Sequence, residues 1–324
     1  MTKMQLQPLK LGTLLLERPI IAAPLAGVSD KAYRRVLKEA GVPLAFTEMV
    51  SAKALAYGNK KSRELVDIRG EERPLGMQLF GRNPLEIREA ALFLESQGAD
   101  IIDFNMGCPA PKVVKNGEGS ALIQEPKLAL EILETLAASV KVPVTLKIRK
   151  SYGNDGHDAL PIIRKLGEVG VAAVFLHGRT REQYYNGRSD WEYIRQAKEA
   201  AAVPLIGNGD VVDASSAREM LALTGCDGIL IGRGFLGNPF LFQEIMDEEK
   251  EFSLGDRLEA AARQLSYAVA DKGEETAVKE MRKHFAWYLK GFRNSSSYRG
   301  RVNACIREQE MLDILEEIMA EGKS

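Results

Sequence analysis

Cys108 stands in a loop whose composition gives a thiol no structural use. Residues 101–120, IIDFNMGCPAPKVVKNGEGS, begin as an apolar strand and continue into a segment with two prolines and three glycines. Such a segment offers no strand or helix face on which a small side chain could be buried. Cys226 and Cys305, in contrast, are expected to be small buried side chains. Three scattered cysteines exclude a disulfide framework or zinc site, so we expect no metal and a chemical role for Cys108.

Two glycine-rich segments, 207–211 and 232–239, have the composition of phosphate-binding loops. Glycine lets backbone N–H groups approach an anion closely, and Arg233 adds a cation. Glycine would serve a tight turn equally well. Because both segments follow apolar runs that are consecutive in the chain, the pair favours a phosphate site.

Eight short apolar, β-branched runs alternate with segments of helical spacing such as 83–98 and 125–140. This alternation predicts an α/β fold, a (β/α)8 TIM barrel. An open Rossmann sheet would need a Gly-x-Gly-x-x-Gly turn after its first strand, where this chain has PLAGVSD. The predicted strands lie in PIIAAPLAG, LAFTEMV, LGMQLFG, ADIIDFNMG, VPVTLKIR, AAVFLHGR, VPLIGNGD and CDGILIGRG.

Glycine and proline mark where these strands begin. Four strands follow a glycine that can take the left-handed conformation at a helix C-terminus. Two others open on a Val-Pro pair, where the proline need not donate to the sheet. These positions are Gly41, Gly98, Gly170, Gly225, Pro143 and Pro204.

Polar side chains collect at the ends of the predicted strands, where the active sites of TIM barrels lie. Any one of them could be polar because it meets water, but the set favours a functional site. The set comprises Ser29, Asp30, Glu48, Gln78, Asn105, Cys108, Lys147, His177, Arg179, Asn208, Asp210 and Arg233.

Length and composition indicate a globular chain of two parts. The 324 residues carry a net charge of −1 and are 45% apolar, without an uninterrupted apolar stretch long enough to span a membrane. No secretory signal is recognised, so we expect a cytoplasmic protein. Strand signals stop near residue 245, and 255–270 and 305–320 have helical spacing. We expect a catalytic barrel over 1–245 and an all-helical domain over 246–324.

The second part contains a local excess of positive charge. Residues 279–307 hold eight Lys or Arg and one acid, Glu280, with interleaved aromatic side chains. Such a patch is typical of nucleic-acid binding. Phe285 and Trp287 stand at helical spacing and are expected to pack inside the domain. The candidates for phosphate contact are Arg282, Lys283, Lys290 and Arg293.

Several motifs together resemble the tRNA-dihydrouridine synthases. They occur in family order as APLAGVSD, FTEM, MQLFG, DFNMGCP, GEGSAL, LKIR, HGRTR, IGNGD and GILIGRG. The segment RKHFAWYLKGF resembles the bacterial subfamily that carries a helical RNA-binding domain. The resemblance implies an enzyme that uses FMN and NADPH to reduce the C5=C6 bond of specific tRNA uridines.

The resemblance also implies roles for individual residues. Hydride would pass from flavin N5 to uracil C6, and Cys108, a thiol that is mostly protonated at neutral pH, would protonate C5. Asn105 would fix the base, while Lys112 and Arg179 would guide it from loops. Lys147 would sit near flavin N1 and O2, and Gln78 would hydrogen-bond the pyrimidine part of the ring. The cofactor-binding set is Pro24, Leu25, Ala26, Gln78, Lys147, His177, Asn208, Gly209, Asp210, Gly232 and Arg233.

Two other functions fit parts of the sequence. A flavin barrel that reduces a free pyrimidine or another small enone would not need the basic segment 279–307. A non-redox barrel acting on a phosphorylated substrate would use Lys147 as a Schiff-base lysine. The sequence does not identify the tRNA position or separate NADPH from NADH, and a monomer fits a site that must admit a whole tRNA.

Overall fold

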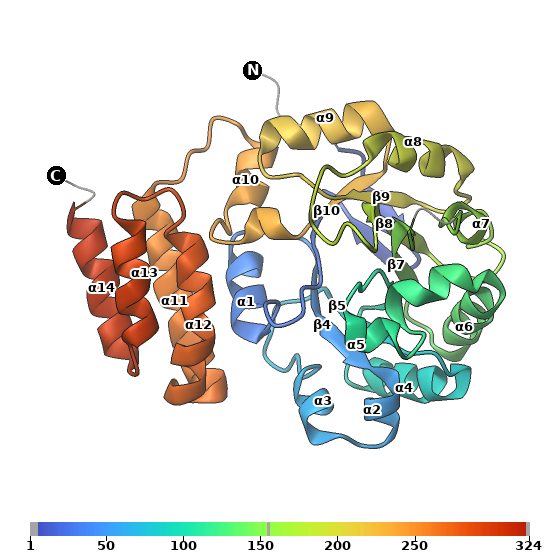
Figure 1. Ribbon diagram of the computed structural model, residues 1–324, viewed down its shortest axis with the longest axis horizontal. Helices are drawn as coiled ribbons and strands as arrows, with labels where there is room; N and C mark the ends of the chain where they lie inside the picture. Colours follow the sequence, from blue (N-terminus) through green and yellow to red (C-terminus); the bar gives the residue numbers. More distant parts are fainter. Residues whose placement is uncertain (1–5, 154–155, 322–324) are drawn as a thin grey trace.

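The computed structural model describes residues 6–153 and 156–321 and contains the predicted (β/α)8 barrel with helices on its outside (Figure 1). All eight predicted strands form, and they are parallel. Their bounds are β3 (Ile20–Ala22), β4 (Ala45–Ser51), β5 (Leu75–Phe80), β6 (Ile101–Met106), β7 (Val144–Ser151), β8 (Ala173–Thr180), β9 (Leu205–Asn208) and β10 (Gly228–Ile231).

The sheet order is β3-β10-β9-β8-β7-β6-β5-β4, and a parallel bridge between Ile21 and Leu44 brings the two end strands together. A hairpin of β1 (Leu9–Leu11) and β2 (Leu14–Leu16), which the sequence did not predict, precedes the barrel. Apolar side chains such as Phe46, Phe175 and Leu230 fill the barrel below its mouth. The polar side chains therefore occupy the layer above a closed apolar core.

The predicted glycines have the backbone conformation expected of them. Gly41, Gly98, Gly170 and Gly225 all have positive φ, between 64° and 91°. They end helical segments ahead of β4, β6, β8 and β10. The helices of the barrel part are α1 (Lys31–Glu39), α2 (Ala52–Ala56), α3 (Lys60–Glu64), α4 (Pro84–Ser96), α5 (Pro111–Val114), α6 (Pro126–Ser139), α7 (Leu160–Ile163), α8 (Trp191–Ala200), α9 (Ala214–Thr224) and α10 (Leu241–Met246), with short 3-10 turns at Gly119–Gln124 and Arg233–Phe235.

The C-terminal part is helical and lies beside the barrel, next to α1 (Figure 1). It consists of α11 (Leu254–Lys272), α12 (Glu274–Tyr288), α13 (Ser295–Ala304) and α14 (Glu308–Glu321). Its apolar core is separate from that of the barrel and includes Phe285 and Cys305, together with Ala32 and Val36 of α1. Within the described residues, no helix is both long and apolar enough to cross a membrane.

Candidate active site

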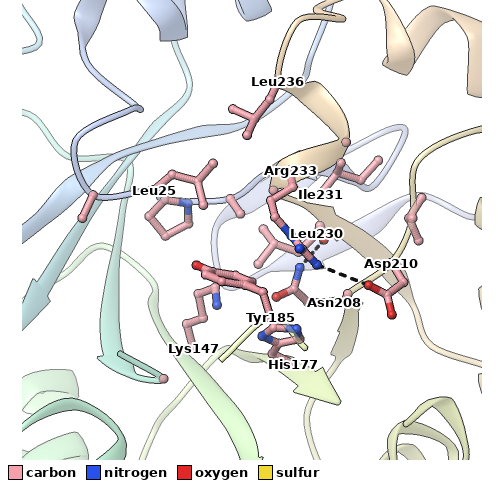
Figure 2. A pocket seen from close by; sticks show the side chains of 18 of the residues that line it. Leu25, Lys147, His177, Tyr185, Asn208, Asp210, Leu230, Ile231, Arg233 and Leu236 are labelled. Carbon is pink, nitrogen blue, oxygen red and sulfur yellow. Dashed lines mark hydrogen bonds and ion pairs between the residues drawn. The ribbon is translucent and has the colours of Figure 1, made fainter. Parts of the chain in front are cut away.

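A cavity of about 480 Å³ opens at the carboxyl ends of the barrel strands. Figure 2 shows Lys147, His177 and Asn208 pointing from neighbouring strands into the same space, beside the ring of Tyr185. Fourteen of the predicted residues line the cavity: Pro24, Leu25, Ala26, Gln78, Asn105, Cys108, Lys147, His177, Asn208, Gly209, Asp210, Gly232, Arg233 and Lys290. The structure thus gathers the predicted cofactor-binding set and Cys108 around one cavity.

Strand register brings four of these side chains together as two neighbouring pairs. Asn105 of β6 pairs with Lys147 of β7, and His177 of β8 pairs with Asn208 of β9. Neighbouring parallel strands place paired residues side by side, and side chains alternate between the two faces of each strand. Asn105 and Lys147 therefore lie side by side, as do His177 and Asn208. The second pair lies one step further along the strands, because His177 pairs with Arg149 and not with Lys147.

A directed set of hydrogen bonds links the Cys108 backbone to the barrel interior. The N–H groups of Gly107 and Cys108 donate to Asn105 Oδ1 at 3.1 and 2.9 Å. Asn105 Nδ2 then donates to Gln78 Oε1 at 2.8 Å, and Gln78 Nε2 donates to Asp103 Oδ2 at 2.6 Å. The amide of Gln78, predicted to hydrogen-bond the flavin ring, is thus also engaged by two protein groups.

The segment that follows Cys108 folds back beneath it. Ser120 donates from its backbone N–H and from Oγ to the Cys108 carbonyl, at 3.2 and 2.9 Å. Gly119 has a φ of +61°, and a Cβ there would lie 3.0 Å from the Cys108 carbonyl oxygen. Burial raises the pKa of the Cys108 thiol, although Lys147 and Arg149 act in the opposite direction. The Cys108 backbone is therefore held in place, and its thiol is protonated at neutral pH.

Lys147 is a half-buried lysine whose ammonium group has no partner among the described residues. Across residues 6–153 and 156–321, its ammonium group makes no hydrogen bond or ion pair with another protein group, and the residue lines the cavity. Burial and the nearby Arg149 lower its pKa, while Asp103 and Cys108 oppose that shift. Burial lowers the pKa of His177 far below its usual range, and the nearby cations, among them Lys147 and Arg149, lower it further. The imidazole of His177 is therefore neutral.

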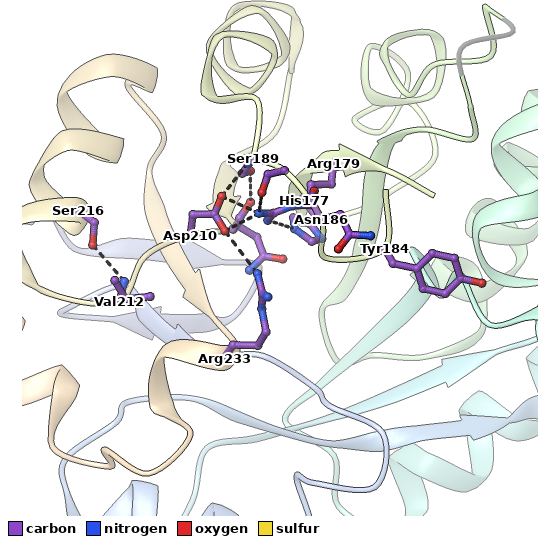
Figure 3. Close-up of polar contacts among 12 residues, drawn as sticks. His177, Arg179, Tyr184, Asn186, Ser189, Asp210, Val212, Ser216 and Arg233 are labelled. Carbon is purple, nitrogen blue, oxygen red and sulfur yellow. Dashed lines mark hydrogen bonds and ion pairs between the residues drawn. The ribbon is translucent and has the colours of Figure 1, made fainter. Parts of the chain in front are cut away.

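Asp210, which lines the cavity, is the centre of a second polar cluster (Figure 3). Its carboxylate accepts from the Ser189 backbone N–H at 2.7 Å, from Arg179 at 2.8 Å and from Arg233 at 3.4 Å. Arg179 was expected on a loop that guides the base. It instead lies in β8 with 2% of its side chain exposed, so its guanidinium positions Asp210 and the 186–187 loop.

Arg149 is a site residue that the sequence analysis missed. From β7, its Nε donates to the Gly107 carbonyl at 2.9 Å, and its Nη1 donates to the carbonyls of Thr180 and Tyr184 at 2.8 and 2.9 Å. It therefore joins the Cys108 loop to the loop after β8. Its place in LKIR, two residues after Lys147 on an alternating strand, was the available signal.

Tyr185 of the same loop also lines the cavity and was not predicted. Its ring lies 4.6 Å from the guanidinium carbon of Arg233 and 5.8 Å from that of Arg149. At such distances the electron-rich face of an aromatic ring attracts a guanidinium group. The ring and both guanidinium groups together form one wall of the cavity.

The predicted tRNA contacts divide into exposed and enclosed groups. Lys112 is exposed, but it lies on α5 and not on a loop; Lys283, Lys290 and Arg293 are exposed as well. Arg282 is partly buried because its Nη2 donates to the Cys305 carbonyl at 2.7 Å. Its position favours a structural role over contact with phosphate.

One aromatic side chain of α12 differs from its expected environment. Trp287 was predicted to pack within the helical domain, but it lines the barrel cavity together with Lys290. His284 of the same helix is 2% exposed, and its Nδ1 lies 3.0 Å from Gln264 Nε2. Phe285 is buried as predicted, as are Cys226 and Cys305.

Three polar strand-end residues have structural contacts outside the cavity. Ser29 Oγ accepts from the Leu25 backbone N–H, and Asp30 caps α1 by accepting from the Tyr33 N–H. Glu48 accepts from the Gly27 N–H. These contacts shape the loop after β3, which carries Leu25 to the cavity.

The fold and the polar cavity define a TIM-barrel protein with an enzyme-type site at the carboxyl ends of its strands. The family described as dihydrouridine synthase (Dus) matches residues 20–323. The chain belongs to this family.

Two relatives support the match along the chain. The chain is 39% identical over 303 residues to a probable tRNA-dihydrouridine synthase of Rickettsia conorii, covering 91% of each chain. It is 36% identical over 314 residues to tRNA-dihydrouridine synthase B of Pasteurella multocida, covering 95% of each. Among solved structures, histamine dehydrogenase from a Rhizobium species shares the fold with a TM-score of 0.59 at 14% identity, over 80% of this chain and 50% of that one.

Proposed function

We propose that the protein is a tRNA-dihydrouridine synthase, which reduces the C5=C6 bond of specific uridines in tRNA with FMN as cofactor and NADPH as reductant. The observation that carries the proposal is the position of Cys108 on the rim of the cavity that Lys147 and His177 enter, in a chain of this family. The relatives in Rickettsia conorii and Pasteurella multocida bear names of the same activity.

Dihydrouridine synthases are flavin-dependent oxidoreductases, and the residues of the cavity fit a flavin nucleotide. The unpaired ammonium of Lys147 can bind the electron-rich edge of the ring, and Arg233 beside Gly232 can bind the phosphate. When bound, the reduced flavin supplies the hydride that uracil C6 receives. Leu25, with its neighbours in the β3 loop, would cover one side of the ring.

Cys108 would supply the proton that C5 requires. A thiol is a suitable acid when it is protonated before the reaction and can release the proton during it. Burial raises the pKa of Cys108, which keeps the proton on sulfur at neutral pH. Lys147 and Arg149 then stabilise the thiolate left behind, because their positive charges act to lower this pKa.

Lys147 would act as a fixed positive charge and His177 as a neutral hydrogen-bonding group. A cation in a site of low water content stabilises developing negative charge strongly. His177 cannot serve as an acid at neutral pH, because burial and four neighbouring cations keep its imidazole unprotonated. His177 is thereby excluded as the proton donor, which is consistent with the assignment of Cys108.

The helical part would bind tRNA through its exposed cations. A uridine must leave its base stack to enter the cavity. Lys290 and Trp287 line that cavity from α12, so a base and its phosphate would meet both parts of the chain. Lys283 and Arg293 would bind phosphates further away. We assign the barrel to residues 1–245 and the tRNA-binding part to 246–324, acting as a monomer in the cytoplasm, where tRNA is found.

The proposal is tested on tRNA from a strain lacking this gene. The tRNA is incubated with purified protein and NADPH, and dihydrouridine is measured by mass spectrometry at each position. We expect dihydrouridine to be missing at a defined position in the strain and restored in vitro. Unchanged dihydrouridine in the strain, with flavin bound to the protein, would favour reduction of a small molecule instead.

A further inference from the structure

Asp103 is a buried acid in the barrel interior that touches neither the cavity nor solvent. It is 0% exposed and does not line the cavity. Strand register places it between Gln78 of β5 and Thr145 of β7, one level below Asn105 on the same face of β6. Its two carboxylate oxygens accept from Gln78 Nε2 at 2.6 Å and from Thr145 Oγ1 at 2.8 Å.

The hydrogen bonds above Asp103 all run in one direction. At the far end, the backbone N–H groups of Gly107 and Cys108 can only donate, so Asn105 must present its oxygen to them. Asn105 then has only its NH2 group to donate to Gln78, and the side-chain carbonyl oxygen of Gln78 accepts this hydrogen bond. Gln78 is left with its NH2 group toward Asp103, where only an acceptor can receive it.

We propose that Asp103 is a positioning residue of the active site: its carboxylate fixes the amide orientation of Gln78 and, through Gln78 and Asn105, the position of the Cys108 loop. The inference rests on the proposed function, in which Cys108 donates a proton and Gln78 and Asn105 face the bound ring and base. Without an acceptor at 103, Gln78 can rotate its amide and leave Asn105 without its partner.

The carboxyl group does not need its negative charge for this role. Burial raises its pKa, and the hydrogen bonds from Gln78 and Thr145 act against that shift. If the group is protonated, the proton can lie on Oδ1 and point to the Thr145 hydroxyl, because a hydroxyl both donates and accepts. Oδ2 remains an acceptor for Gln78 in either form.

Two variants of similar shape separate the effect of the Gln78 amide orientation from the effect of the negative charge at position 103. Asp103→Asn keeps an oxygen toward Gln78 and can donate its NH2 group to Thr145, but it removes the charge. Asp103→Leu keeps the branched shape and removes the acceptor. In Asp103→Asn we expect iodoacetamide to alkylate Cys108 at a rate within about threefold of the wild-type rate. Dihydrouridine formation in a single turnover should stay within the same range.

We expect Asp103→Leu to change the alkylation rate of Cys108 by about fivefold or more and to slow dihydrouridine formation by about tenfold or more. Cys226 and Cys305 are buried and serve as internal controls for intact folding. Should Asp103→Leu not fold, Gln78→Met breaks the same connection and must likewise change the reactivity of Cys108.

The outcomes are decisive in each case. Wild-type alkylation and turnover in a folded Asp103→Leu protein would overturn the proposal, as would equal losses in the Asn and Leu variants, which would make charge the cause. Alkylation needs neither tRNA nor flavin reduction. If the wild-type protein formed no dihydrouridine, the proposed function would fail while alkylation still tested the positioning of Cys108.

Discussion

Gly119→Ala should disturb Cys108 although Gly119 itself does not line the cavity. Gly119 has a φ of +61°, which L-residues with a Cβ adopt at a cost. The added Cβ would lie 3.0 Å from the Cys108 carbonyl oxygen, 3.0 Å from Val113 Cγ1 and 3.1 Å from Cys108 Cβ. Gly225→Ala is the matched control, because φ is +64° there and nothing lies within 4 Å of the new Cβ.

The two variants differ in the steric contact alone. The left-handed conformation costs a non-glycine residue about 1–2 kcal/mol, and the stiffer unfolded chain returns about 0.4–1 kcal/mol. Gly225→Ala should therefore lose about 1 kcal/mol of stability. Crowding in a packed region adds about 1–3 kcal/mol, so Gly119→Ala should lose about 2–4 kcal/mol.

Urea denaturation of both variants measures these losses, and alkylation of Cys108 reports the local effect. We expect only Gly119→Ala to change the alkylation rate, because Gly225 lies at the end of α9, away from the cavity. Equal losses of stability in the two variants, or an unchanged alkylation rate in Gly119→Ala, would refute the reasoning that Cys108 is held by this contact.

Three further predictions concern individual charges. Lys147→Met should weaken flavin binding by about tenfold or more, measured by equilibrium titration, because it removes a charged hydrogen-bond donor; unchanged affinity would contradict its assignment. Lys283→Glu with Arg293→Glu should raise the KM for tRNA while NADPH oxidation is spared, and a normal KM would count against the tRNA surface. Burial lowers the pKa of His284 from 6.5 to about 4. The unfolded chain therefore binds the extra proton, so stability is complete above pH 6.5 and falls toward pH 4, by about 3 kcal/mol relative to His284→Gln; parallel urea curves for the two proteins would refute this.

The eight strands and their order along the chain were predictable because the sequence signals for a strand are local. Apolar β-branched runs, preceded by glycines such as Gly98 or prolines such as Pro143, fixed all eight strands. Because the strands were expected to form a parallel barrel, polar residues at their ends, such as Lys147 and His177, were expected at one edge of that barrel. Once the fold is a barrel, its geometry brings together residues that are distant in the chain.

The parts that the sequence did not predict depend on side-chain direction. Arg149 and Asp103 sit on strands among apolar residues, and their contacts follow from register and pleat, which the sequence does not give. Arg179 was placed on a loop because HGRTR is polar, yet β8 extends to Thr180 and buries it. Trp287 was assigned to the helical core because helical spacing cannot reveal which face meets the barrel.

The most direct test of the account is a single turnover of chemically reduced enzyme with tRNA that lacks dihydrouridine. Flavin reoxidation and dihydrouridine are followed together in the wild-type protein and in Cys108→Ala. General acid catalysis is worth about 10²–10⁴-fold, so the variant should bind and reduce its flavin normally but form dihydrouridine at least a hundredfold more slowly. Equal rates in the two proteins would contradict the assignment of Cys108 as the proton donor.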